Sequence, residues 1–295
     1  MQSNITYFVG IDGGGTKCRA EVFDENGLSL GAGVSGPANV ARQGDTARNS
    51  ILQAVTLALT NAGLDAKTEL ANSAVGAGLA GANLPSAKAA LKNWRHPFAG
   101  FSFTSDLHAA MLGAHGGSNG AVLVVGTGSC AAALVESQLY QYGGHGFTIG
   151  DKGSGAWMGR QAAIHTLEAL DGVAPRGALC EAVCAHYQTN STIKLVDRLN
   201  HAPPADFGEL SPAVISLAEQ GDKVASAIVI TGTDYLTAIA RKALAQSPGK
   251  LVLVGGVAGA IVPWLAKDVA DAIVSAKYGP EWGAFYYQQS LFQEA

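Results

Sequence analysis

The sequence predicts an α/β protein with two domains of duplicated topology around a cleft, and a helical insertion in the second domain. An apolar run, a glycine turn and a second apolar run occupy residues 7–23, and the same order returns at 121–135. Two apolar runs joined by a tight glycine turn are typical of a strand pair. From 156 to about 246 apolar residues recur at helical spacing instead. The repeated unit indicates two related domains.

The composition suits a chain with a sizeable core and no nucleic-acid or membrane partner. Its 295 residues are 48% hydrophobic and 14% charged, a length that favours two domains. The net charge is -4 and basic residues form no run, so nothing indicates nucleic acid or an anionic membrane surface. No apolar run reaches the roughly 18 residues that span a bilayer, and the start has no signal-peptide features.

The cysteines predict neither a disulfide framework nor a zinc site. Cys18, Cys130, Cys180 and Cys184 include no C-x-x-C pair. Cys180 and Cys184 are one helical turn apart, which favours small buried residues on one helix face. Reduced thiols indicate the cytoplasm.

The predicted elements divide near residues 116–118. We expect a first domain over 1–116 and a second over 117–295, with the last helix a candidate to pack back on the first domain. The expected strands cover 7–9, 20–23, 30–34, 74–81, 101–104, 121–125, 131–135 and 251–254. The expected helices cover 47–62, 85–94, 107–115, 156–170, 178–187, 193–200, 213–220, 222–245 and 280–292.

The most informative stretch is the glycine turn at 13–17. Three consecutive glycines let a backbone approach a ligand with no Cβ in the way, and their N–H groups with the Thr16 hydroxyl can point at phosphate oxygens. Asp12 precedes the turn and would repel an anion unless a cation lay between them, so it predicts Mg²⁺. The alternative is a hairpin chosen for its turn geometry, but such a turn needs only one or two glycines. Lys17 could contact a phosphate or point to solvent.

Asp106 follows the strand expected at 101–104. The carboxyl end of a strand is where open α/β sheets bind ligands, and a carboxylate there can orient a hydroxyl and accept its proton. The alternative is that Asp106 only caps the helix that follows. Because the glycine turns indicate a phosphate site as well, we favour the role of catalytic base for Asp106.

The ordered set of motifs resembles a known family. It consists of Asp12–Thr16, Asp106, Gly126–Ser129 and Gly255–Gly256, with Gly150–Gly155 similar to a G-D-E-G-S block. The set resembles the sugar-kinase branch of the actin/hexokinase/Hsp70 superfamily, and more closely the N-acetylglucosamine/glucosamine kinases and the BadF/BadG/BcrA/BcrD ATPase family. The resemblance spans essentially the whole chain and implies two actin-like (ribonuclease H-like) domains around a nucleotide cleft.

The resemblance implies ATP-dependent phosphorylation of N-acetyl-D-glucosamine or D-glucosamine at the 6-hydroxyl, by a homodimer that uses ATP and Mg²⁺. It implies that Asp12 organises Mg²⁺, directly or through water, and that Asp106 is the base. It implies ATP contacts at Gly13, Gly14, Gly15, Thr16, Lys17, Thr127, Gly128, Gly255, Gly256 and Val257. It implies sugar contacts at Asn39, Asp106, Ser129, Gly144, His145 and Asp151.

Two residues depart from the family pattern. The family often has Trp where His145 stands and Glu where Lys152 stands. His145 would lie beside the sugar, and a more polar wall there would suit the 2-ammonium group of glucosamine. Asn39 is explained equally well by a local Asx turn, and Asp151 has the alternative of pairing with Lys152.

Two other functions remain open in the sequence. One is a BadF-type ATPase that activates a partner enzyme, a group whose cysteines bridge an iron–sulfur cluster between subunits. Cys180 and Cys184 do not lie in such a setting. The other is a kinase of a different hexose.

Overall fold

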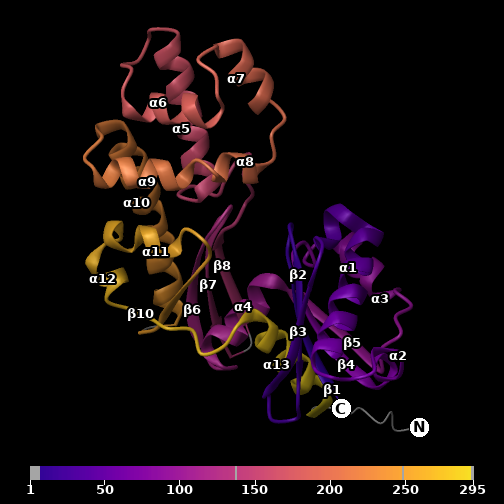
Figure 1. Ribbon diagram of the computed structural model, residues 1–295. Coiled ribbons are helices and arrows are strands. Elements are labelled where there is room, and N and C mark those ends of the chain that lie inside the picture. Colours follow the sequence, from indigo (N-terminus) through magenta and orange to yellow (C-terminus); the bar gives the residue numbers. More distant parts are fainter. Residues whose placement is uncertain (1–6, 137, 248, 294–295) are drawn as a thin grey trace. The chain divides into compact units, whose positions relative to one another are not determined.

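The computed structural model describes residues 7–136, 138–247 and 249–293 (Figure 1). They form two compact units. Unit 1 holds the described residues up to Asn119 together with those from Ala276 onward, and unit 2 holds Gly120–Ser275. The last segment of the chain therefore groups with unit 1, whereas the predicted division kept it in the second domain.

Unit 1 is built on a five-stranded sheet in the order β3-β2-β1-β4-β5. The strands are β1 (Tyr7–Gly13), β2 (Cys18–Phe23), β3 (Ser29–Ser35), β4 (Ser73–Leu79) and β5 (Gly100–Ser105). β2 runs antiparallel to its neighbours β1 and β3, while β4 and β5 run parallel with β1. Gly13 pairs with Leu79 and Leu79 with Ser105, so the ends of the three parallel strands meet at one edge.

Helices cover both faces of this sheet. Val9 and Ile11 of β1 belong to the same buried cluster as Ile51 of α1 (Val40–Asn61). Alternate β1 residues face the other way, where α4 (Asp106–His115) and α13 (Pro280–Gln293) pack. A Cβ added to Gly10 would lie 1.8 Å from the carbonyl oxygen of Glu281, so the backbone of α13 rests directly on the sheet. The shorter helices are α2 (Ala66–Glu69), η1 (Leu70–Asn72) and α3 (Pro85–Lys92).

The first helix starts earlier than predicted. The sequence pattern placed it at 47–62, but the structure begins it at Val40, after the cap residue Asn39. Gly44 interrupts it with φ 46° and ψ -113°. A single turn before the interruption is too short to show a helical period, so the pattern revealed only the second part.

Unit 2 repeats the topology of unit 1. Its sheet has the order β10-β9-β6-β7-β8. The strands are β6 (Gly120–Val125), β7 (Ser129–Val135), β8 (Gln138–Gly143), β9 (Leu251–Val254) and β10 (Ile273–Val274). Listed from β8, the order and directions match those of unit 1, with β7 antiparallel to both neighbours and β9 and β10 parallel with β6. The predicted duplication is confirmed.

Most helices of unit 2 lie between β8 and β9. They are α5 (Gly155–Leu170), α6 (Ala178–His186), α7 (Thr192–Leu199), α8 (Pro204–Gly208), α9 (Ser211–Glu219) and α10 (Lys223–Gln246). After β9 come α11 (Ala258–Ile261), η2 (Val262–Trp264) and α12 (Lys267–Ala270). One core joins Leu123 of the sheet to Met158, Val214 and Leu236 of the helices.

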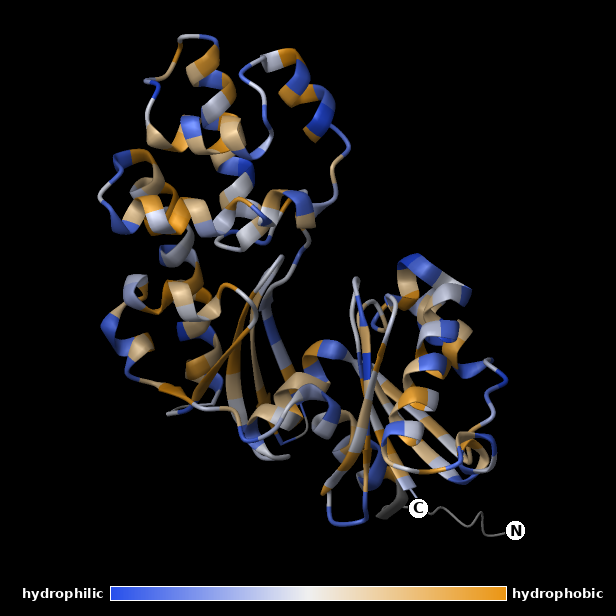
Figure 2. Cartoon of the chain, viewed as in Figure 1, coloured by the Kyte–Doolittle hydropathy of each residue, from blue (hydrophilic) through white to orange (hydrophobic). Residues whose placement is uncertain are grey.

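Hydropathy follows this arrangement. Figure 2 shows the strands coloured mainly hydrophobic to neutral, while hydrophilic residues concentrate on the helices and the turns. Among the described residues, no helix combines the length and the apolar character that crossing a membrane requires.

Candidate active site

The first glycine turn connects β1 and β2 and leaves open space in front of it. The Gly14 N–H donates to the Lys17 carbonyl at 2.9 Å and closes the turn. A Cβ added to Gly14 would meet only that carbonyl, at 3.7 Å, and one added to Gly15 would meet nothing within 4 Å. Neither residue has a positive φ. Neither packing nor backbone conformation therefore requires glycine at these two positions, which fits a site kept free for a ligand.

Gly13 has a different role from its two neighbours. A Cβ at this position would lie 2.5 Å from Cδ2 of Leu79. The predicted phosphate contact at Gly13 thus has a packing explanation as well. Thr16 and Lys17 are exposed, so both side chains are accessible to a ligand.

Asp12 and Asp106 come together at the edge where β1, β4 and β5 end. Asp12 is paired across the sheet with Gly78 of β4. A Cβ added to Gly78 would lie 3.6 Å from the Cα of Asp106. Two carboxylates that are distant in the sequence therefore share one corner of unit 1, as their placement at strand ends predicts.

The environment of Asp12 opposes its negative charge. The pKa of Asp12 is raised to about 6, first by burial and then by the charges of Glu281 and Asp106, while Lys17 and Arg19 act in the opposite direction. Three carboxylates near two cationic side chains leave an excess of negative charge that a divalent cation would offset.

Arg19 is already engaged by carboxylates. Its Nη1 lies 2.9 Å from Oε1 of Glu281 and 2.8 Å from Oε2 of Glu21. Glu281 was not among the predicted site residues, because nothing in the sequence around Pro280 indicates that the last helix lies beside Asp12.

The structure assigns the helix cap before α4 to Ser105 rather than to Asp106. Ser105 Oγ accepts from the His108 N–H at 3.1 Å. Asp106 is the first helical residue, and its Oδ1 accepts from the Leu107 N–H at 2.9 Å. Burial raises the pKa of Asp106, against the effect of backbone hydrogen bonds. Since Ser105 is the N-cap of α4, capping does not explain Asp106, and its carboxylate stays available as a base.

Asn39 caps α1 beside the first turn. Its Oδ1 accepts from the N–H groups of Ala41 and Arg42, each at 3.1 Å. The adjacent Ala38 N–H donates to the Gly14 carbonyl at 2.8 Å and ties this loop to the turn. The local-turn alternative accounts for the side-chain oxygen, and the predicted sugar contact remains a prediction.

The second turn, between β6 and β7, is filled where the first is open. The Gly126 N–H donates to the Gly128 carbonyl at 2.9 Å, and Thr127 between them is exposed. A Cβ added to Gly128 would lie 2.9 Å from Oδ2 of Asp151, so this glycine makes room for a protein carboxylate. The exposed Thr127 remains accessible as a predicted phosphate contact.

Asp151 is buried, and it links the second turn to the loop that carries His145. Its Oδ1 accepts from the Gly146 N–H at 3.2 Å. Burial raises the pKa of Asp151, while the Gly146 and Ser129 backbone N–H groups and the His145 side chain lower it. Its φ of 55° is unusual for a residue other than glycine and indicates that the surrounding structure holds it in place.

The alternative role of Asp151, pairing with Lys152, is absent from the ion pairs of the described residues. Lys152 Nζ instead lies 6.0 Å from the centre of the Trp157 ring. Ser129 is 3% exposed and its hydroxyl donates to the Lys152 carbonyl at 2.9 Å, and its predicted sugar contact remains a prediction. Gly144 and His145 are exposed, as sugar contacts need to be.

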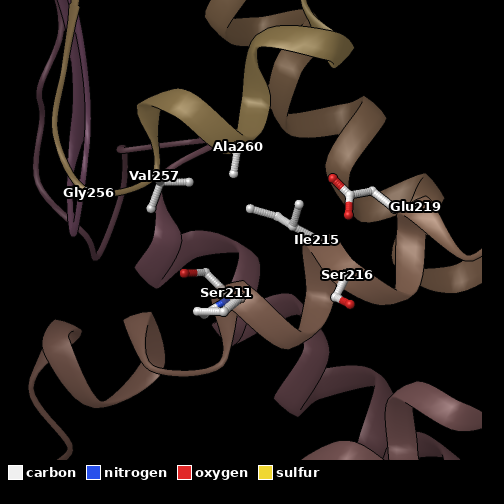
Figure 3. Close-up of a pocket in the computed structure, with 8 residues that line it drawn as sticks. Ser211, Ile215, Ser216, Glu219, Gly256, Val257 and Ala260 are labelled. Carbon is white, nitrogen blue, oxygen red and sulfur yellow. The ribbon is translucent and has the colours of Figure 1, made fainter.

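A pocket of about 290 Å³ opens in unit 2 beside the loop after β9. Gly256, Val257 and Ala260 line one side, and residues of α9 line the other (Figure 3). The Val257 N–H donates to the Val125 carbonyl at 3.0 Å, which fixes the loop next to the second turn. A Cβ added to Gly256 would meet nothing within 4 Å. The predicted adenosine contacts at Gly256 and Val257 thus lie at a real pocket.

Gly255 is close to the pocket but does not line it. Its φ is 111°, and an added Cβ would lie 2.4 Å from the Val125 carbonyl oxygen. The chain therefore needs glycine here to turn between β9 and the pocket loop.

The α9 side of the pocket was not predicted. The missed lining residues are Ser211, Pro212, Ile215, Ser216 and Glu219, with Ala260 from α11. The sequence pattern identified the helix but contained no motif to connect it with Gly256, which lies far away along the chain.

The metal-ligating residues do not form a preformed cage. The described part of the chain holds no group of three or more His, Cys, Asp or Glu side chains that could bind a metal ion. The four cysteines are free, and Cys180 is buried as predicted, whereas Cys184 is partly exposed. Asp12 alone is compatible with Mg²⁺, because this ion usually keeps several waters and binds through one or two carboxylates and substrate phosphates.

Known proteins are similar to this chain over most of its length. The model of the BadF/BadG/BcrA/BcrD ATPase family matches residues 9–287. A glucosamine kinase of Vibrio cholerae serotype O1 is 35% identical over 287 residues, which cover 96% of each chain. An N-acetyl-D-glucosamine kinase of Dictyostelium discoideum is 27% identical over 243 residues, 78% of this chain and 76% of that one. A crystal structure from Chromobacterium violaceum, provisionally assigned as an N-acetylglucosamine kinase, has a TM-score of 0.91 and 30% identity, covering 97% of this chain and 100% of that one.

Proposed function

We propose an amino-sugar kinase function from the premise that this chain belongs to the BadF/BadG/BcrA/BcrD ATPase family. The reaction would transfer the γ-phosphoryl group of ATP to the 6-hydroxyl of D-glucosamine or N-acetyl-D-glucosamine. The observation that carries the proposal is the similarity, over nearly the whole length, to a protein named a glucosamine kinase. The two-domain actin-like fold agrees with it.

Phosphoryl transfer requires positioning and charge neutralisation more than covalent chemistry from the protein. In unit 1 the open turn would present the Gly15 N–H and the Thr16 hydroxyl to phosphate oxygens, while the Gly14 N–H closes the turn on the Lys17 carbonyl. Asp106 would accept the proton of the sugar hydroxyl, since it lies directly after a strand and Ser105 is the residue that caps the helix. The exposed Thr127 would be a phosphate contact of unit 2.

Asp12 is the residue suited to hold Mg²⁺, directly or through water. The excess of carboxylates around it fits a divalent cation, which when bound supplies charge neutralisation at the phosphate oxygens. Arg19, held between Glu21 and Glu281, would keep the buried Glu281 carboxylate beside Asp12 in place.

The proposed sugar contacts are the predicted ones, namely Asn39, Asp106, Ser129, Gly144, His145 and Asp151. The buried Asp151 carboxylate is fixed by backbone N–H groups and is therefore a rigid acceptor for a sugar hydroxyl. His145 offers a polar, exposed side chain beside it, which favours D-glucosamine over its acetylated form. We also expect a homodimer in the cytoplasm.

A coupled assay of ADP release tests the proposal. The purified chain is supplied with ATP and Mg²⁺ and with D-glucosamine, N-acetyl-D-glucosamine, N-acetyl-D-mannosamine or D-glucose, one at a time. We expect sugar-dependent ADP release with one of the two glucosamines and its loss with EDTA. ADP release that no sugar changes would contradict a sugar kinase and would favour an ATPase that activates a partner.

A further inference from the structure

The unit 2 pocket has the shape of a slot between two apolar walls. Figure 3 shows Val257 and Ala260 on one side and the Ile215 side chain directed toward them from α9. Ile215 is buried, so this wall is fixed by the core. An apolar slot of about 290 Å³ fits a flat heteroaromatic ring, which gains from burying its faces while its polar edge stays free.

The slot has a direction set by α9. The helix begins at Ser211, whose Oγ would lie 3.0 Å from a Cβ added to Gly155, and the Gly155 N–H donates to the Gly126 carbonyl of the second turn. Glu219 ends the helix eight residues later, roughly 12 Å farther on at 1.5 Å per residue. A nucleotide with its phosphates near Gly126 would therefore extend its base along α9 toward Glu219.

Glu219 is the only charged side chain that lines this pocket. It is exposed, and within the described part of the chain it makes no hydrogen bond or ion pair. Figure 3 shows its carboxylate turned toward Ile215 and Ala260, not away from the pocket. An ionised carboxylate only accepts hydrogen bonds, so it can pair with an amino group on the ring edge and repels a carbonyl oxygen.

We propose that Glu219 makes the kinase selective for adenine nucleotides, by accepting a hydrogen bond from the 6-amino group of the base. The inference rests on the proposed function for the presence of a nucleotide in this pocket. Guanine and hypoxanthine carry a carbonyl oxygen at the same ring position. This oxygen and the Glu219 carboxylate both only accept hydrogen bonds, so they would repel each other. Discrimination then arises from both attraction and repulsion at one ring position.

Inosine diphosphate is the sharpest probe, because it replaces the 6-amino group of ADP by a carbonyl and leaves the sugar and phosphates unchanged. Calorimetric binding of ADP and inosine diphosphate, without any sugar, is compared for the native chain, Glu219→Gln and Glu219→Lys. We expect the native chain to prefer ADP about 10-fold, as one charged hydrogen bond at an exposed edge provides.

A glutamine can accept from an amino group or donate to a carbonyl, so Glu219→Gln should reduce the preference to about 2-fold or less. Glu219→Lys should invert it.

Glu181→Gln is the matched control, because it removes an exposed carboxylate of unit 2 on α6 and should leave the preference unchanged. The inference would be overturned if Glu219→Gln preferred ADP over inosine diphosphate as strongly as the native chain does. It would also be overturned if the native chain bound neither nucleotide. The two proposals can fail separately. Base preference that depends on Glu219 in a chain that phosphorylates no sugar would refute only the kinase. Equal sugar phosphorylation with ATP and inosine triphosphate would refute only the role of Glu219.

Discussion

The two units share one sheet topology but carry different residue types at equivalent strand ends. The second cross-strand pair from the glycine turn is Asp12 with Arg19 in unit 1, and Val124 with Cys130 in unit 2. Unit 1 has Asp106 directly after β5, whereas Ser275 follows β10 at the equivalent place in unit 2. The difference indicates that ionic chemistry is concentrated in unit 1, while unit 2 provides an apolar pocket from its helical segment.

The glycine turns differ in the same way. Gly15 faces open space, while Gly128 faces the Asp151 carboxylate of its own unit. Glycine thus stands in the two turns for different physical reasons. In unit 1 it leaves space for a ligand, and in unit 2 it makes room for a side chain of the same unit. Substitutions at selected positions can test this distinction.

The largest effect is expected at the carboxylate that unit 2 lacks. Asp106→Asn should lower kcat about 1,000-fold, within the range for loss of a general base, because an amide cannot accept the proton of the sugar hydroxyl. Steady-state ADP release measures it, and unchanged thermal unfolding confirms that the fold is retained. Glu25→Gln, at the exposed β2–β3 turn of the same unit, is the control. If Asp106→Asn kept more than a tenth of native activity, the chemistry would not depend on this residue as base.

Two glycines of unit 1 should respond oppositely. Gly10→Ala forces a Cβ against the Glu281 carbonyl oxygen and should lower the free energy of unfolding by about 3 kcal/mol, the upper range for overpacking. Gly15→Ala should change that free energy by less than about 0.5 kcal/mol, as expected for a surface substitution, yet should raise the KM for ATP. Urea unfolding and ATP titration measure the two effects. A stable Gly10→Ala variant would contradict the close approach of α13 to the sheet.

Asp12→Asn should separate function from stability. The pKa of Asp12 is raised to about 6, so the folded chain holds this proton more tightly than the unfolded chain does. The resulting destabilisation is absent below about pH 4, grows as pH rises and is complete above about pH 6. At pH 7.5 without Mg²⁺ the free energy of unfolding of the variant should therefore exceed that of the native chain by about 3 kcal/mol, and with Mg²⁺ the variant should lose activity. Thermal unfolding at pH 3.5 and 7.5 checks the sign, because the difference should vanish at the lower pH.

Local patterns predicted the parts of the fold that depend on neighbours in the sequence. The β1 and β6 hairpins, the strand at 251–254 and the long helix before it follow from apolar periodicity and glycine turns. β8 was missed, although it contains Leu139, Tyr140 and Tyr142, because its identity depends on pairing with β7. β10 is two residues long and exists only through its pairing with β9.

The sequence by itself determined the duplicated sheets, the two glycine turns and Asp106 at a strand end, since each is encoded within a short run of residues. Tertiary structure decided which glycines face open space, that Ser105 rather than Asp106 caps α4, and that Ser129 points inward. It also brought Glu281 beside Asp12 and α9 beside Gly256. These contacts join segments far apart along the chain, and burial and close packing, which create them, have no local signature in the sequence.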